Sequence, residues 1–357
     1  MIIGHGGNIH ELARRLGCTP SDIIDMSSNM NPLGPPPGLM DYLSAHLDSI
    51  FALPEADADR MRTVAADWHQ IFPDQVLAGN GTTQFIYALP RLLKTERALI
   101  LAPTYADYTD ACRMAEAAHD YIYTSTGDDF APDMNALENK LDKFDTVFIC
   151  NPNNPTGRLI PGADLAFLCR RYPKIRFIID ESYLPFVVDG EGESLIHSGL
   201  ENVIILSSMS KIFRIPGLRV GFVIGAERMI QKFSGYAMPW SVNSLAQESI
   251  CFLLRQTEMI KRFIESTRDF IEAEKRRFVE YFQDTSKIRF FPSATGFLLA
   301  ELKDFTAETV WQEMARHRFL IRNCSNFNGL SDKFIRISLK TASENKKAAE
   351  LLKQIVL

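Results

Sequence analysis

Residues 146–211 contain three short apolar runs, each followed directly by a polar segment: TVFIC (146–150) by NPNNPTG (151–157), RFII (176–179) by DESY (180–183), and VIILS (203–207) by SMSK (208–211). Runs rich in β-branched residues and separated by helical stretches are typical of a mainly parallel sheet that helices cover on both faces. The same alternation continues in strands expected at 98–101, 121–124 and 219–224, and in helices expected at 104–117 and 163–171. The sequence therefore predicts an α/β fold with a mainly parallel central sheet.

The pattern changes outside this region. The Pro/Gly-rich stretch 31–38 cannot form regular structure and predicts an ordered crossing segment. Near the start, Asn8 and Gly17 are typical of the first and last positions of a short helix. Beyond about residue 240, a charged amphipathic region predicts helix over 244–282, and short strands are expected at 296–300, 319–322 and 334–339. We expect a large domain over residues 40–240 and a small α/β domain built from residues 1–39 and 241–357.

Composition narrows the class of protein. The 357 residues carry 39 Lys and Arg against 44 Asp and Glu, and a net charge of −5 argues against a general nucleic-acid or anionic-membrane binder. No apolar run approaches the ~20 residues of a membrane helix, and the first residues lack the pattern of a signal peptide. The six cysteines and seven histidines show no metal-ligand spacing, so we expect reduced thiols and no metal site. A cytoplasmic globular protein with a small-molecule partner, and with no nucleic-acid or membrane partner, is the expectation.

Polar residues at the ends of the expected strands are the candidate site, because ligands of open parallel sheets bind there. Gly-Asn-Gly at 79–81, followed by Thr82, can cradle a phosphate at a helix N-terminus, although a turn without a ligand has the same composition. Asp180 ends a buried strand, where a carboxylate is costly without a cationic partner. Lys211 lies among hydroxyls and could act as an amine nucleophile, whereas a lone lysine is more often a solvated charge.

Taken together, these segments resemble the fold-type I pyridoxal-phosphate enzymes, specifically the aspartate-aminotransferase-like group. The matching pattern is NPNNPTG, then Asp-x-x-Tyr, then Ser-x-Ser-Lys-x-Phe-x-x-x-Gly-x-Arg-x-Gly, in this order over residues 151–221. The resemblance implies that fold, with pyridoxal 5'-phosphate (PLP) as the cofactor and a homodimer as the assembly.

The resemblance also implies a role for each matching residue. Lys211, Asp180 and Tyr183 are the expected catalytic residues: Lys211 binds the cofactor covalently, and Asp180 keeps its pyridine nitrogen protonated so that the ring accepts electrons. Tyr183 and Asn154 are expected to hydrogen-bond the ring oxygen, and Tyr105 to stack on the ring. The residues expected to hold the cofactor phosphate are Gly81, Thr82, Ser208, Ser210 and Arg219.

Segments outside the central region narrow the resemblance. Residues 5–9, 25–34, 238–243 and 320–324 look like those of L-threonine O-3-phosphate decarboxylases, relatives of histidinol-phosphate aminotransferases. The implied reaction is decarboxylation of L-threonine O-3-phosphate to (R)-1-aminopropan-2-yl phosphate for cobalamin (cobamide) biosynthesis. Three alternatives stay open: an L-serine O-phosphate decarboxylase in the same pathway, a histidinol-phosphate-type aminotransferase and, least favoured, a non-catalytic PLP-binding protein.

A substrate with a carboxylate and a phosphate needs partners at both ends. Arg336 alternates with Ile335 and Ile337 along a strand and therefore faces away from their apolar side. By resemblance, Arg336 takes the α-carboxylate with Asn29, and Asn154 also contacts the substrate. Arg322 and His5 are expected to take the phosphate, with Lys340 as a more distant positive charge. A lone arginine would equally be typical of a surface ion pair.

One segment departs from the pattern of the family. A Tyr-Pro pair is usual near residue 53, and its tyrosine crosses the dimer interface to the cofactor phosphate. Here the pair is Leu53-Pro54, and a leucine cannot donate that hydrogen bond. The contact is therefore either lost or supplied by another group.

Overall fold

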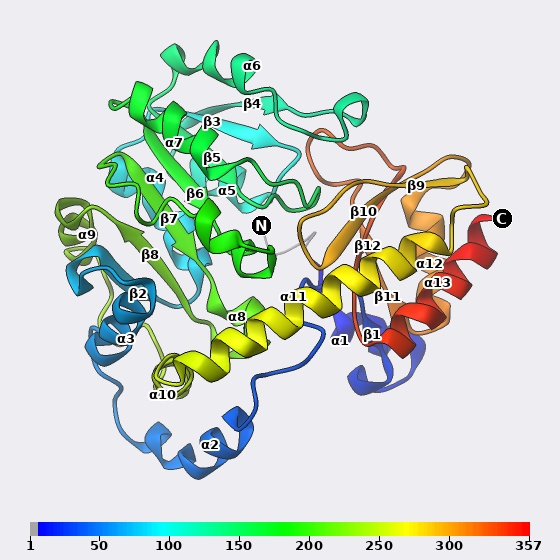
Figure 1. The fold of residues 1–357 in the computed structure, drawn as a ribbon, viewed down its shortest axis with the longest axis horizontal. Coiled ribbons are helices and arrows are strands. Elements are labelled where there is room, and N and C mark those ends of the chain that lie inside the picture. Colours follow the sequence, from blue (N-terminus) through cyan, green and yellow to red (C-terminus); the bar gives the residue numbers. More distant parts are fainter. Residues whose placement is uncertain (1–5) are drawn as a thin grey trace.

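A seven-stranded sheet forms the centre of the larger part of the molecule (Figure 1). The computed structural model describes residues 6–357. The strands, in the order in which they pair, are β2 (Val76–Gly79), β8 (Gly221–Gly225), β7 (Val203–Ser207), β6 (Arg176–Asp180), β5 (Thr146–Cys150), β3 (Arg97–Ala102) and β4 (Ala118–Tyr123). Only β8 is antiparallel to its neighbours; the pairs from β7 to β4 are all parallel. The prediction of a mainly parallel central sheet is confirmed.

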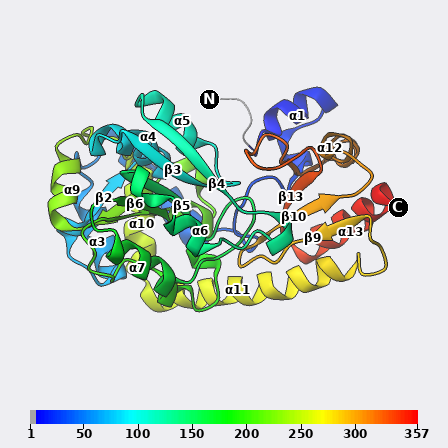
Figure 2. The same ribbon diagram turned by 90° about the horizontal axis from the view of Figure 1, so that it is seen from above.

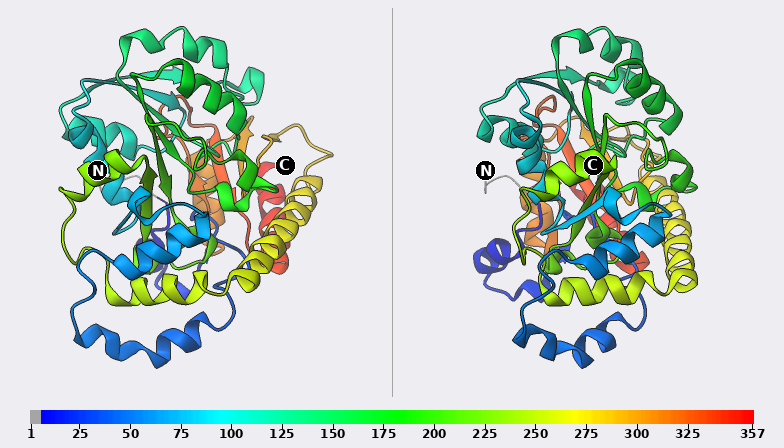
Figure 3. Two further views of the ribbon diagram at one scale, coloured as in Figure 1. Left: turned by 60° about the vertical axis from the view of Figure 1, so that its left-hand side comes forward. Right: turned by 90° about the vertical axis from the view of Figure 1, so that its left-hand side faces the viewer.

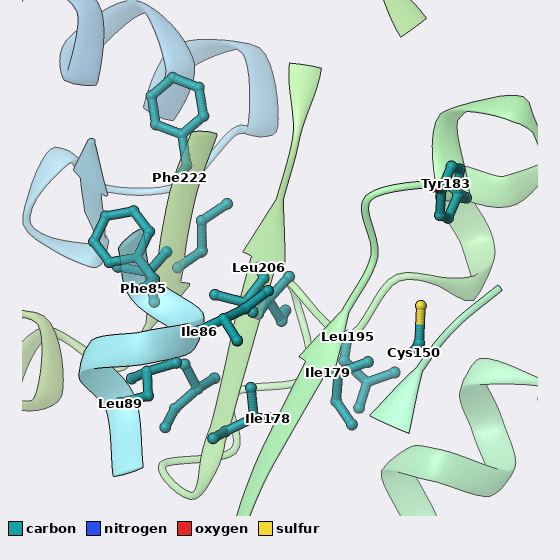
Figure 4. Close-up of a cluster of buried hydrophobic side chains, with 14 of the residues drawn as sticks. Phe85, Ile86, Leu89, Cys150, Ile178, Ile179, Tyr183, Leu195, Leu206 and Phe222 are labelled. Carbon is teal, nitrogen blue, oxygen red and sulfur yellow. The ribbon is translucent and has the colours of Figure 1, made fainter. Parts of the chain in front are cut away.

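Helices lie on both faces of this sheet (Figures 2 and 3). The helices of this part of the molecule are α2 (Leu39–Ala45), α3 (Asp59–His69), α4 (Thr82–Leu93), α5 (Asp107–Met114), α6 (Met134–Glu138), α7 (Gly162–Arg171), α8 (Met209–Ile212), α9 (Glu227–Ser234) and α10 (Ser244–Leu254). Of these, α2 packs against α10, and α8 is a single turn at the end of β7. Figure 4 shows how α4 packs: Phe85, Ile86 and Leu89 lie against the apolar side chains of the strands. Strands buried on both faces explain the continuous apolar runs in the sequence.

A smaller antiparallel sheet forms the second part of the molecule, in the order β12 (Arg322–Asn323), β13 (Phe334–Ser338), β10 (Phe297–Leu302) and β9 (Ile288–Phe290). The helices α12 (Ala307–Arg316) and α13 (Ala342–Val356) cover it. The N-terminal segment joins this part, because β1 (Ile24–Asp25) pairs with β11 (Phe319–Leu320). Helix α1 (Ile9–Leu16) begins at its cap Asn8 and ends at Gly17, whose φ is 65°, as the sequence predicts.

One long helix, α11 (Thr257–Glu280), connects the two parts (Figure 2). Its residues Ile260, Ile264 and Ile271 belong to the core of the large sheet, and Phe278 belongs to the core of the small sheet. The Pro/Gly-rich segment crosses beside this helix and is ordered: the Asn31 side chain donates to Thr267 Oγ1 of α11 at 2.9 Å and to the Ile212 carbonyl at 2.8 Å.

Several predicted boundaries are wrong. The strand expected at 121–124 is β4, which begins at Ala118, because on this edge strand only Ile122 is buried and the apolar signal is short. The strand expected from Arg219 begins at Gly221, since Arg219 has a φ of 56°. The helix expected over 244–282 is interrupted between α10 and α11, and the strand expected at 319–322 divides into β11 and β12, which lie in different sheets. No strand was predicted at β1, β2 or β9.

Among the described residues, no helix combines the length and the apolar character that crossing a bilayer requires. The same residues contain no cluster of three or more His, Cys, Asp or Glu side chains able to hold a metal ion.

Candidate active site

The carboxyl ends of β5, β6 and β7 are adjacent at one edge of the large sheet, because these strands are parallel neighbours. A cavity of about 190 Å³ opens there. It is lined by all ten residues for which the sequence predicts a cofactor contact: Gly81, Thr82, Tyr105, Asn154, Asp180, Tyr183, Ser208, Ser210, Lys211 and Arg219. Segments up to 138 residues apart in the chain thus form a single site.

Asp180 ends β6 and is 5% exposed. One carboxylate oxygen accepts a hydrogen bond from the Tyr108 hydroxyl at 2.8 Å, and the other accepts one from the Ser182 backbone N–H at 3.0 Å. Neither donor is a cation, and a carboxylate this buried is stabilised by a cationic partner. A protonated pyridine nitrogen in the cavity is a group of that kind.

Lys211 lies in the single turn of α8 that follows β7. Its Nζ lies 4.6 Å from the centre of the Tyr183 ring. The Tyr183 hydroxyl accepts a hydrogen bond from Asn29 Nδ2 at 3.1 Å. The amine and the phenol therefore face the same cavity from two different strand ends.

The opposite end of the cavity has the donors that a phosphate requires. Gly81 has a φ of 76°, and a Cβ atom there would lie 2.7 Å from the Arg219 guanidinium. A Cβ atom on Gly221 would lie 2.5 Å from the Thr82 backbone nitrogen. The first amides of the 12-residue helix α4 are thus close to an arginine, and the Ser208 and Ser210 hydroxyls, 2.9 Å apart, line the same cavity. A helix N-terminus, hydroxyls and an arginine together fit a phosphate group.

A second cavity of about 220 Å³ adjoins the first, since Met30, Tyr105, Asn154 and Tyr183 line both. Arg336 of β13 reaches into this second cavity and is 5% exposed. Its guanidinium donates to Asn154 Oδ1 and to the Ser27 carbonyl, while its buried Nε has no hydrogen-bond partner. A buried N–H without an acceptor is costly, and an anionic ligand would satisfy it.

Arg322 lines the second cavity from the neighbouring strand, where it is paired in register with Arg336. Its guanidinium donates to Asn326 Oδ1 at 2.7 Å and lies 5.1 Å from the centre of the Phe327 ring. Burial, with a contribution from the positive charge of Arg336, lowers the pKa of Arg322 to about 10. The buried guanidinium of Arg336 and the half-buried guanidinium of Arg322 face one cavity, and together they favour a ligand with negative charge.

The remaining predicted substrate residues have different surroundings. The Asn29 Oδ1 accepts from the Ser338 hydroxyl, and Asn29 lines the second cavity. Lys340 lines neither cavity; its Nζ donates to the Ser28 carbonyl at 3.1 Å, and burial lowers its pKa to about 8. His5 lies outside the described residues.

Sequence reasoning missed Tyr108, Ser27 and Asn326. Each contacts a predicted site residue, namely Asp180, Arg336 and Arg322 respectively. For Tyr108 alone a signal exists, since it lies three residues after Tyr105, in the first turn of the helix that follows.

The fold and the ten-residue cavity define a class of protein: an α/β enzyme of the aspartate-aminotransferase-like fold, with a lysine, an aspartate and a phosphate cradle at adjacent strand ends. The chain belongs to the aminotransferase class I and II family, whose model matches residues 21–354. PLP is the cofactor of this family, so the predicted family, fold and cofactor are confirmed.

The relatives that are similar to this chain include both threonine-phosphate decarboxylases and histidinol-phosphate aminotransferases. The threonine-phosphate decarboxylase of Salmonella typhimurium is 30% identical over 99% of the chain and 96% of the relative. The histidinol-phosphate aminotransferase of Clostridium acetobutylicum has a solved structure that superimposes with a TM-score of 0.85 at 26% identity, covering 92% of this chain and 98% of that one. The adenosylcobalamin biosynthesis bifunctional protein CobDQ of Leptospira interrogans is 28% identical over 98% of the chain, but the chain spans only 41% of that longer protein.

Proposed function

We propose that this protein is a PLP-dependent carboxy-lyase that decarboxylates L-threonine O-3-phosphate to (R)-1-aminopropan-2-yl phosphate for cobalamin biosynthesis. The observation that carries the proposal is the pair Arg322 and Arg336, paired in register and lining one cavity beside the cofactor cavity. A substrate with two anionic ends fits these two cations, of which Arg336 is buried and Arg322 half-buried. The names of the Salmonella typhimurium and Leptospira interrogans relatives support the same reaction and pathway.

The cofactor residues have separate tasks in this proposal. When bound, PLP supplies an aldehyde carbon for the substrate amine and a ring that accepts the electrons of a bond broken at the α-carbon. Lys211 would hold the cofactor covalently through its amine, and the substrate amine would take that place. Asp180 keeps the pyridine nitrogen protonated, and Tyr183 and Asn154 hydrogen-bond the ring oxygen.

The other cofactor contacts fix the position of the ring. Tyr105 would stack on the ring, and Gly81, Thr82, Ser208, Ser210 and Arg219 would hold the phosphate; all six residues line the first cavity. The glycine turn and the N-terminus of α4 supply backbone N–H donors, and Arg219 supplies a bidentate charge.

The substrate residues select the bond that breaks. Arg336, with Asn29 and Asn154, holds the α-carboxylate so that its bond to the α-carbon is perpendicular to the ring. Arg322 and His5 hold the phosphate, and Lys340 adds positive charge from behind the loop that contains Ser28. After carbon dioxide leaves, Lys211 returns a proton to the α-carbon.

A histidinol-phosphate aminotransferase is the second candidate, favoured by the similarity to the Clostridium acetobutylicum structure. Histidinol phosphate has no carboxylate, so Arg336 would be unpaired in that half of the reaction. L-serine O-phosphate differs from the proposed substrate by one methyl group and would satisfy both arginines equally well.

The decisive experiment measures carbon dioxide released from threonine phosphate and serine phosphate by the PLP-loaded protein, with no 2-oxo acid present. We expect release from threonine phosphate at the higher rate. Rapid conversion of histidinol phosphate with 2-oxoglutarate, and no carbon dioxide from either phospho-amino acid, would overturn the proposal in favour of the aminotransferase.

We also propose that the protein works as a cytoplasmic homodimer, on a soluble substrate. An exposed apolar patch supports the dimer: Met40, Ile50, Phe51, Leu53, Tyr236, Met238 and Trp240 are all more than half exposed. The Trp240 backbone N–H bonds the Ala56 carbonyl at 2.9 Å, which holds the two segments together. Exposed apolar side chains on neighbouring segments are typical of protein interfaces. Sedimentation should show a dimer, and Phe51→Glu should weaken it.

A further inference from the structure

Tyr108 is a buried residue of the cofactor site with no assigned task. It lies on α5, is 1% exposed and lines the first cavity. Its hydroxyl and Asp180 Oδ2 are 2.8 Å apart. Burial, together with the nearby Asp180 charge, holds the pKa of Tyr108 well above its ordinary value, so the hydroxyl keeps its proton and is the donor.

The ring of Tyr108 is fixed by aromatic neighbours on two sides. It is stacked with Phe148 of β5, with ring centres 5.3 Å apart and planes at 21°. Its contact with Tyr105 is edge-to-face, at 5.8 Å and 82°. Both geometries are favourable for aromatic pairs. Besides Phe148, Tyr108 thus contacts two residues with proposed cofactor roles. These are Asp180, proposed to pair with the pyridine nitrogen, and Tyr105, proposed to stack on the cofactor ring.

We infer that Tyr108 is a positioning residue of the cofactor site, which keeps Asp180 ionised and oriented toward the pyridine nitrogen and supports the Tyr105 ring. The inference rests on the proposed role of Asp180. The other titratable groups around this carboxylate are Tyr105, Cys150, Glu181 and Lys211. Of these, Cys150 is a neutral thiol, because burial raises its pKa to about 12.

The expected effect of losing the hydroxyl has a definite sign. A buried carboxylate that loses a hydrogen-bond donor binds a proton more tightly. Asp180 would then take a larger share of the proton that it shares with the pyridine nitrogen, and the ring would carry less positive charge. Positive charge on the ring opposes protonation of the nitrogen that joins Lys211 to the cofactor. The pKa of that nitrogen should therefore rise when the Tyr108 hydroxyl is removed.

The experiment follows the visible absorption of the PLP-loaded protein as a function of pH in three variants. Tyr108→Phe removes the hydroxyl and keeps both ring contacts. Asp180→Asn removes the charge itself. Tyr121→Phe is the matched control, since its hydroxyl bonds Thr109 Oγ1 of the same helix at 2.9 Å and lines neither cavity. Thermal unfolding of the cofactor-free proteins reports whether each variant folds.

The midpoint of the absorption change reports the pKa of the nitrogen that joins Lys211 to the cofactor. We expect this midpoint to be about one pH unit higher in Tyr108→Phe than in the wild-type protein, which corresponds to the loss of one hydrogen bond to a charged group. Asp180→Asn should shift it further in the same direction, and Tyr121→Phe should leave it at the wild-type value. If the midpoint is unchanged in Tyr108→Phe but shifted in Asp180→Asn, the inference about Tyr108 is overturned and the proposed role of Asp180 is not. Wild-type midpoints in both would overturn the role of Asp180 in the proposed function as well.

A second substitution tests the inference without removing any atom from the core. Site-specific incorporation of 3-fluorotyrosine at position 108 makes the hydroxyl more acidic and so a stronger donor. The midpoint should then move below the wild-type value, opposite to Tyr108→Phe. An unchanged or raised midpoint would contradict the inference.

Discussion

At the scale of single residues, Lys211 is the most specific assignment of the site. Its Nζ faces the Tyr183 ring at the edge of the first cavity, next to the hydroxyls of Ser208 and Ser210. We predict that borohydride reduction of the PLP-loaded protein, followed by peptide mapping, labels Lys211. Lys211→Ala should lose the label, and Lys232→Ala, an exposed lysine of α9, should keep it. A label on another lysine of the wild-type protein would contradict the assignment.

Arg322 offers the residue-scale test of substrate recognition. Arg322→Ala should weaken binding of threonine phosphate roughly ten- to a hundredfold, because a hydrogen bond to a charged group contributes ~1.5–3 kcal/mol. Wild-type protein should discriminate against unphosphorylated threonine by a comparable factor. Arg316→Ala, which removes an exposed arginine paired with Glu313, is the control and should bind normally. Equal loss of affinity for phosphorylated and unphosphorylated threonine would mean that Arg322 does not contact the phosphate.

The sequence alone brings the cofactor residues together, but not the residues around them. The family resemblance, carried by motifs at strand ends, predicted ten cofactor residues, and these ten residues line one cavity. Tyr108 and Asn326 lie outside these motifs, since their contacts depend on the packing of α5 on β5 and on the path of the loop after β12. Asn29 was expected at the substrate, and the structure adds that it hydrogen-bonds Tyr183 and Ser338.

At the scale of elements, burial decides which strands were predictable. β5 and β7 were predicted to the residue, because their side chains are almost all buried and the apolar run ends where the strand ends. β4 is mostly exposed, and its predicted bounds were wrong. β9 has only three residues, and it was not predicted. The break between α10 and α11 has no Pro or Gly to mark it, so periodicity alone predicted a single helix.

The segment after β6 provides an element-scale prediction about stability. The Glu181 carboxyl group accepts hydrogen bonds from the Ser194 hydroxyl at 2.6 Å and the Leu195 backbone N–H at 2.9 Å, which ties this segment to the end of β6. Burial raises the pKa of Glu181 from 4.5 to about 7. Between these two values the folded state binds more protons than the unfolded state, so the free energy of unfolding falls as the pH rises.

We therefore expect the Glu181 carboxyl group to lower the free energy of unfolding by ~3 kcal/mol as the pH rises from about 4.5 to 7. Denaturant unfolding of Glu181→Gln should show a flatter pH dependence in that window. The exposed substitution Glu201→Gln should leave the slope unchanged. A wild-type slope in Glu181→Gln would show that other groups cause the pH dependence.

At the scale of the whole molecule, the second cavity lies where the two parts meet. Arg322 and Arg336 come from the small sheet, Asn29 from the N-terminal segment, and Tyr105, Asn154 and Tyr183 from the loops of the large sheet. Neither part alone lines the whole of this cavity. This arrangement explains why the sequence could name these residues by resemblance but could not derive their meeting: the strand pair β1–β11, which brings the N-terminal segment to the small sheet, joins segments that are far apart in the chain.

In the proposed homodimer, Leu53 is the position that would connect cofactor binding to the assembly of two chains. It is 75% exposed, lines neither cavity and is one of the exposed apolar side chains, with Phe51 and Trp240, on which the proposed dimer rests. If the missing hydroxyl leaves one phosphate contact unmade, Leu53→Tyr should tighten PLP binding by ~1 kcal/mol, or about fivefold in Kd. Leu53→Phe adds the ring without the hydroxyl and should not reproduce the gain. The gain should also disappear when Leu53→Tyr is combined with Phe51→Glu, because the contact crosses the interface. Titration of cofactor-free protein with PLP measures each Kd, and an unchanged or weaker Kd in Leu53→Tyr would mean that another group already fills this position.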